Sequence, residues 1–64
     1  MMSETERTQR VTYHACRHAI AAVDEKLARK SSAPFKDALQ MERQSYVDLA
    51  NEITEAVDGL QSVK

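Results

Sequence analysis

The sequence is poor in residues that interrupt or cross-link a chain. Its 64 residues include one glycine, one proline, one cysteine and no tryptophan. Because Cys16 is the only cysteine, no disulfide can form within the chain. The pattern predicts a small buried thiol in a reducing compartment, and we expect a cytoplasmic protein. The one glycine, Gly59, excludes a glycine-rich loop of the kind that holds phosphate groups.

Long apolar segments are also missing. The longest runs only from Ala19 to Val23, whereas a membrane-spanning helix needs about 20 apolar residues. The first residues are polar and acidic and lack the pattern of a secretory signal. A net charge of −1 gives the chain no overall attraction for nucleic acids or acidic membranes. At 42% hydrophobic and 30% charged residues, the composition indicates a folded helical domain.

The sequence does contain a hydrophobic repeat with steps of three and four residues, which runs through it twice. Such a repeat places side chains along one seam of a helix. The break between the runs predicts an all-α, antiparallel helical hairpin, with helices over about 4–30 and 34–58, a turn at 31–33 and a single domain over 1–64. The expected seam residues are Tyr13, Cys16, Ile20, Val23 and Leu27 in the first helix and Phe35, Leu39, Glu42, Tyr46, Leu49, Ile53, Ala56, Leu60 and Val63 in the second.

Signals for the helix ends support this arrangement. Ser3 and Glu6 match the capping box that starts a helix. Ser32 is the expected N-cap of the second helix, with Pro34 in its first turn. Gly59 is the expected stop, because glycine readily adopts the left-handed conformation that follows a helix.

The apolar surface is wider than one seam between two helices requires. Alanines widen it on the first helix, at positions 15, 19 and 22, and further apolar residues widen it on the second. A chain this short also buries little surface alone. We therefore expect a homodimer in which two hairpins pair into a four-helix bundle. The alternative left open is that a different protein covers the extra flank.

The sequence contains no catalytic signature, so we expect a non-enzymatic protein, without a cofactor, that acts by binding another protein. Regulators, inhibitors and chaperone-like adaptors, including those of phages and mobile elements, are proteins of this size. The candidate contact residues are apolar or aromatic groups beside the seam, since such groups dominate interface energetics. They are Met41, Tyr46, Val47, Ala50 and Val57, with Tyr13 as a further candidate anchor.

A few polar residues suggest chemistry, but each has a simpler interpretation. Glu42 lies on the expected seam. Its side chain is expected to reach toward Lys26 or to set the register of the two helices. A catalytic carboxyl group with a raised pKa is the less favoured interpretation. His14 and His18 are four residues apart, as two zinc ligands on a helix would be. Because only Glu25 lies near enough to join them, we expect surface histidines and no bound metal.

Binding to RNA is the alternative function. The predicted architecture resembles that of small plasmid-encoded regulators of copy number, which are RNA-binding helical hairpins that dimerise. The resemblance covers architecture alone, with no shared motif. Arg7, Arg10 and Arg17 have acidic residues opposite them in the expected hairpin, so nucleic acid is the less favoured partner.

Overall fold

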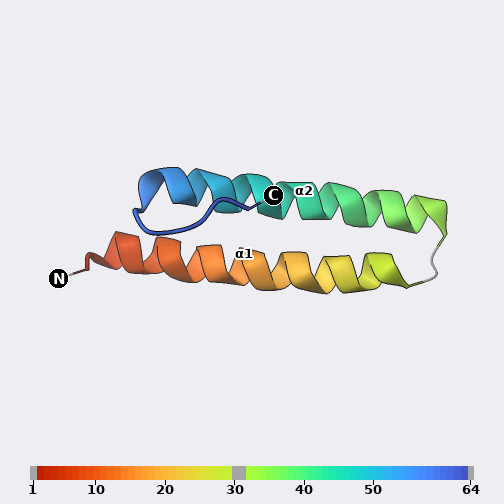
Figure 1. Ribbon diagram of the computed structural model, residues 1–64, viewed down its shortest axis with the longest axis horizontal. Coiled ribbons are helices and arrows are strands. Elements are labelled where there is room, and N and C mark those ends of the chain that lie inside the picture. The colour runs from red at the N-terminus through yellow and green to blue at the C-terminus, as the bar shows by residue number, and fades with distance from the viewer. Residues whose placement is uncertain (1, 30–31, 64) are drawn as a thin grey trace.

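The chain folds into two antiparallel α-helices that lie side by side along their whole length (Figure 1). The computed structural model describes residues 2–29 and 32–63. Helix α1 is Glu4–Ala28 and helix α2 is Ala33–Ala56, and the described residues contain no β-strand. The molecule measures 47 × 15 × 15 Å. The predicted all-α hairpin is confirmed. In the described part of the chain, neither helix has the length and apolar character needed to cross a membrane.

Helix α1 begins where the sequence predicts. The Ser3 hydroxyl accepts a hydrogen bond from the Glu6 backbone N–H at 3.0 Å, and Glu4 and Glu6 lie in the first turn near the positive end of the helix dipole. Helix α1 ends at Ala28, followed by Arg29 in an extended conformation. The expected continuation to residue 30 and the start of the turn at residue 31 lie outside the described residues.

Helix α2 starts at Ala33, after Ser32, with Pro34 in its first turn. It ends at Ala56, two residues before the expected end at residue 58. The reason is that Val57 leaves the helical conformation, at φ −126°, and its side chain is buried. Gly59 then adopts φ +90° and reverses the chain direction.

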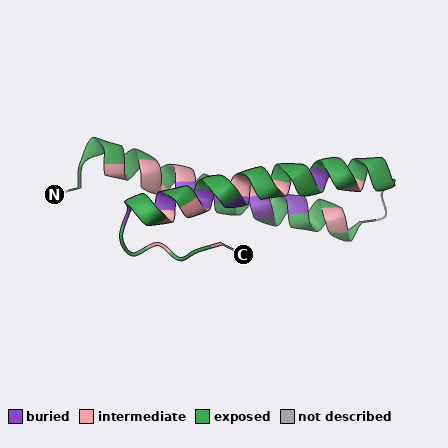
Figure 2. Ribbon diagram, turned by 90° about the horizontal axis from the view of Figure 1, so that it is seen from above, coloured by how far each residue is buried: buried purple, intermediate pink, exposed green. Residues whose placement is uncertain are grey.

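The buried residues form a row along the contact between the two helices (Figure 2), and their side chains are apolar. Burying each of the larger ones contributes about 1.5–3 kcal/mol. On α1 the buried residues match the predicted seam. The whole set is Tyr13, Cys16, Ile20 and Val23 from α1 and Leu39, Val47, Ala50, Ile53 and Val57 from α2 and the residue after it.

The predicted seam on α2 is wrong at four of its seven positions. Leu39 and Ile53 are buried and Tyr46 is half-buried, as expected. Glu42 and Ala56 are exposed, Phe35 is 51% exposed and Leu49 is 41% exposed. The positions one residue later take their place, at residues 43, 50 and 57. Helix α2 is therefore rotated about its axis relative to the expected register.

Packing in the cluster around Tyr13 explains this rotation. Tyr13 is the largest fully buried side chain, and it shares a cluster with Ala50 and Val57. Ala50, which has no exposed surface, lets α1 and α2 approach closely within this cluster, and a larger residue there would not fit such dense packing. At the edge of the seam, Arg43 Nε donates to Asp24 Oδ1 at 2.7 Å, so a charged residue at this position also finds a partner.

Candidate functional site

The hairpin has two long flanks where the sides of α1 and α2 meet, and they differ in what covers them. Residues 57–63, here called the tail, turn back at the end of α2 and run along one flank (Figures 1 and 2). The tail runs back toward the middle of the hairpin rather than away from it. The opposite flank carries no such covering segment among the described residues and is here called the open face.

Two side chains hold the end of the tail by its main chain. The Tyr13 hydroxyl donates to the Gln61 carbonyl oxygen at 2.6 Å. The Asn51 amide pairs with both main-chain groups of Val63: its Nδ2 donates to the carbonyl oxygen at 3.0 Å, and its Oδ1 accepts from the N–H at 2.7 Å. The tail is thus fixed to α1 and to α2 at the same time.

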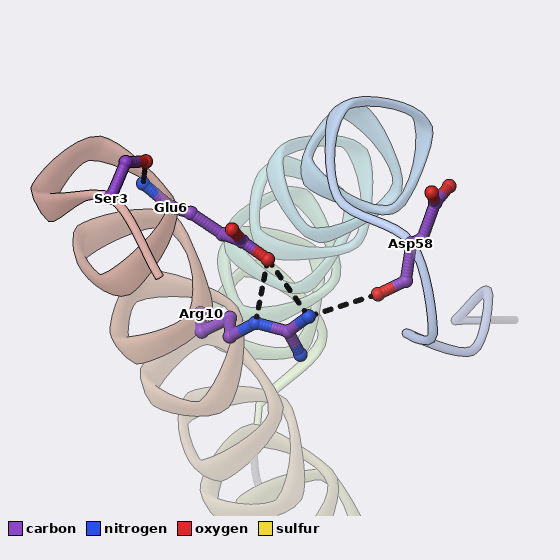
Figure 3. A network of polar contacts seen from close by, with 4 residues as sticks. All are labelled: Ser3, Glu6, Arg10 and Asp58. Carbon is purple, nitrogen blue, oxygen red and sulfur yellow. Dashed lines mark hydrogen bonds and ion pairs between the residues drawn. The ribbon is translucent and has the colours of Figure 1, made fainter. Parts of the chain in front are cut away.

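Arg10 holds the beginning of the tail (Figure 3). Its Nη2 donates to the Asp58 carbonyl oxygen at 3.1 Å and to Glu6 Oε1 at 3.1 Å. Glu6 is itself bound through its backbone N–H to Ser3. The first turns of α1 therefore orient the guanidinium that contacts the tail.

Apolar contacts complete the attachment of the tail. Val57 is buried, and Leu60 and Val63 are half-buried against the cluster that contains Tyr13 and Cys16. Burial raises the pKa of the Cys16 thiol, because the charged thiolate loses its contact with water. The thiol behaves here as a small apolar group.

The open face consists of two ladders of side chains, one on each helix, with steps of three and four residues. Its apolar members include Leu49 and Phe35, which is 51% exposed. Part of this face is a groove of about 310 Å³, where Thr8 and Thr12 of α1 lie opposite Leu49 and Glu52 of α2. The ladder on α1 is Thr8, Thr12, Ala15, Ala19, Ala22 and Lys26, and the ladder on α2 is Phe35, Ala38, Glu42, Ser45, Leu49, Glu52 and Ala56.

The residues predicted to contact a partner are not gathered on one surface. Val47, Ala50 and Val57 were expected outside the hairpin seam, and this placement is wrong: all three are buried within the hairpin, because α2 is rotated about its axis relative to the expected register. Met41 is 74% exposed on the outer side of α2.

The two tyrosines belong to the core region rather than to a free surface. Tyr46 is half-buried and packs against the central cluster. Tyr13 lies inside this cluster. Arg17 lies over the Tyr13 ring at 5.9 Å from its centre and donates to its hydroxyl at 3.3 Å. Tyr13 therefore fixes the tail and the helix contact together.

The remaining polar candidates lie on exposed surface. His14 and His18 are both exposed, and the His14 ring meets the edge of Tyr13 at 5.4 Å between ring centres. Among residues 2–29 and 32–63, no three histidine, cysteine or acidic side chains are grouped as a metal site would require. Glu42 lies on the open face rather than in the hairpin seam.

Sequence reasoning missed the role of Asn51. The available signal was the run Val57, Leu60 and Val63, which continues the apolar spacing past Gly59 and so indicates a segment that packs on the core. The chain end must then find hydrogen-bonding partners, and an asparagine on α2 can supply both a donor and an acceptor.

Comparison with known protein families, with characterised proteins and with solved structures gives no significant match.

Proposed function

We propose that this chain is a non-enzymatic, protein-binding hairpin whose open face pairs with that of a second copy to form a dimeric four-helix bundle. The observation that carries the proposal is the open face itself. It presents Leu49 and Phe35 to solvent beside a row of alanines at positions 15, 19 and 22. Apolar surface arranged in helical ladders is typical of a helix-packing interface.

The amount of exposed surface supports a partner of this size. The chain has an accessible surface of 4917 Å². A compact monomer of 7.2 kDa has about 4,100 Å² by the scaling of folded proteins. The excess of about 800 Å² equals the area that each partner buries in an interface of standard size. A second hairpin of the same length is therefore a fitting occupant.

The distribution of large and small residues favours one arrangement of the two copies. A twofold axis along the hairpin would set α1 of one copy antiparallel to α2 of the other. Leu49 would then meet the small side chains Ala15 and Ala19 of the second copy, which leave room for it.

Charges favour the same arrangement. The contact between Asp24 and Arg43 fixes the relative level of the helices, so Lys26 and Glu42 lie at nearly the same height on the open face. With the axis along the hairpin, Lys26 approaches Glu42 of the second copy. An axis across the hairpin would instead bring Glu42 toward Glu52 of the second copy, which pairs like charges.

We propose further that the bundle acts as a regulator, inhibitor or chaperone-like adaptor in the cytoplasm. A single buried thiol is compatible with a reducing compartment. RNA binding receives less support, because Arg10 is bound to Glu6 and the tail, and Arg17 is engaged with Tyr13. Phosphate binding requires basic side chains that are free to reach the backbone of the nucleic acid.

Sedimentation equilibrium of the untagged chain and two matched variants tests the proposal. We expect a dimer at micromolar concentration for the wild type, a monomer for Leu49→Asp, and a dimer for the control Met41→Asp. Leu49 lies in the groove of the open face, whereas Met41 lies on the outer side of the same helix. A wild-type mass of one chain at 100 µM or a dissociated Met41→Asp variant would contradict the proposal. The first result would leave a different protein as the occupant.

A further inference from the structure

All the hydrogen bonds that hold the tail are made to its main-chain atoms. Asn51 binds the N–H and the carbonyl of one residue, Val63, as a neighbouring β-strand would. Tyr13 and Arg10 bind carbonyl oxygens of the tail. None of these contacts depends on which side chain the bound residue carries, so the same atoms can hold another segment that follows the same path, with a glycine at the turn.

The side chains of the tail add a simple apolar pattern. Val57, Leu60 and Val63 face the core at intervals of three residues. The residues between Leu60 and Val63, Gln61 and Ser62, are exposed. The flank under the tail therefore selects a segment that turns at a glycine and carries aliphatic residues at this spacing.

The tail is also attached more loosely than either helix. After the Val57 N–H, which is bound to the Ile53 carbonyl, the tail has no helical or strand hydrogen bonds, and the Val63 N–H is bound to a side chain. Leu60 and Val63 remain partly exposed even when docked. Segments with few backbone bonds and incomplete burial open locally without unfolding of the whole protein.

We propose that the flank formed by Arg10, Tyr13 and Asn51 is a binding site for a non-helical aliphatic segment of a partner protein that turns at a glycine, as the tail does. The chain's own tail occupies this site as an intramolecular competitor. The inference rests on the proposed protein-binding function and adds the class of partner. It concerns the flank opposite the open face, so the dimer mass and the peptide binding described below can fail independently.

Hydrogen exchange of the unmodified chain provides the first test. We expect the Val63 amide to exchange at least 100-fold faster than the Ile53 amide in the core of α2, because the tail opens on its own. Equal protection of the two amides would overturn the proposal, since the tail would then be part of the cooperative core and the site would not become accessible.

Peptide binding provides the second test. The probe is a fluorescent peptide with the tail sequence Val-Asp-Gly-Leu-Gln-Ser-Val, and the receptor is full-length Leu60→Asp, whose own tail has lost an apolar contact. We expect fluorescence anisotropy to show at least tenfold tighter binding to this variant than to the wild type. Adding Asn51→Leu to the variant should abolish binding, because the bonds to the peptide main chain are lost.

Two control peptides test the specificity of the site. A peptide that keeps Val, Gly, Leu and Val but carries serine at the other positions should bind within about threefold of the first, because the site reads main chain and aliphatic groups. A peptide with aspartate in place of the leucine and the last valine should not bind. A variant that is folded by circular dichroism but binds no peptide would overturn the proposal. If Leu60→Asp unfolds, the hydrogen-exchange result on the wild type decides whether the proposal stands.

Discussion

Ala50 and Tyr13 are buried in the same cluster: Ala50 has 0% of its surface exposed and Tyr13 has 2%. Burying Ala50 requires α2 to be rotated about its axis relative to the register in which Leu49 would face α1. With Ala50 turned toward α1, Leu49 is turned toward the open face. The small residue at position 50 therefore decides both how the hairpin packs and which apolar side chains remain available to a partner.

Replacing Ala50 by leucine should destabilise the fold. The larger side chain would have to enter the closely packed cluster around Tyr13, and overpacking of this kind costs about 1–3 kcal/mol. Urea denaturation followed by circular dichroism measures the loss. Ala21→Leu, at an exposed position of α1, serves as a control and should change the free energy of unfolding by less than about 0.5 kcal/mol. Equal effects of the two substitutions would show that Ala50 is not tightly packed.

Val47→Asp separates the two possible registers of α2. The heptad pattern of the sequence places Val47 on the outer surface, where a charge is harmless. The structure leaves only 7% of its surface exposed. A buried, unpaired carboxylate should cost at least about 3 kcal/mol and unfold so small a protein. The thermal unfolding curve of Val47→Asp checks this, with Met41→Asp as the matched surface control; a wild-type melting temperature for Val47→Asp would restore the register expected from the sequence.

Tyr13→Phe tests the attachment of the tail. The substitution keeps the packed ring but removes the hydroxyl that donates to the Gln61 carbonyl. We expect a loss of about 0.5–1.5 kcal/mol in stability. Amide exchange of residues 60–63 should become faster while exchange in the middle of α2 changes only with global stability. If the tail amides keep their wild-type protection relative to the helix, the hydroxyl does not anchor the tail.

The buried Cys16 thiol predicts a dependence of stability on pH in the alkaline range. Its pKa is raised above the ordinary value of 9.0 by burial. Below pH 9 the thiol is protonated in both the folded and the unfolded chain, so its contribution is fully present. As the pH rises through 9, only the unfolded chain ionises, and the folded state loses stability.

Comparison with Cys16→Ala isolates this effect from other groups that titrate at high pH. The difference in unfolding free energy between the wild type and Cys16→Ala, measured in urea under reducing conditions, should shrink between pH 8 and pH 10. A constant difference over this range would mean that the thiol ionises equally in both states and is not desolvated in the fold.

The sequence predicts α1 well because its signals agree. The seam through Tyr13, Ile20 and Val23 has no competing apolar ladder of large residues, and Ser3 with Glu6 marks the first turn clearly. Since the spacing and the cap point to one helix with one buried face, little depends on tertiary packing.

The register of α2 could not be predicted in the same way. Two ladders share Leu39, Tyr46 and Ile53, and they differ in whether residues 42, 49 and 56 or residues 43, 50 and 57 join them. Hydrophobicity favours the ladder that contains Leu49. Packing favours the ladder that contains Ala50. The repeat within one helix carries no information on which residue sizes fit against the other helix, so the sequence pattern does not indicate this choice.

The tail contacts were beyond sequence reasoning for a related reason. Gly59 correctly indicates that the helix stops and the chain turns. The pairing of Asn51 with Val63 joins residues 12 apart and depends on the direction the chain takes after that turn.

Three of the predicted contact residues, Val47, Ala50 and Val57, were misplaced together, because one rotation of α2 moved all three into the core.

The most direct test of the central claim, that the open face is covered by a second copy, is a nuclear Overhauser experiment on mixed dimers. One copy carries ¹³C-labelled methyl groups and the other is unlabelled, so only contacts between copies are observed. We expect signals between the Leu49 methyls of one copy and the Ala15 and Ala19 methyls of the other. Signals from Met41 in place of Leu49, or no signals between copies at a concentration of 1 mM, would contradict it.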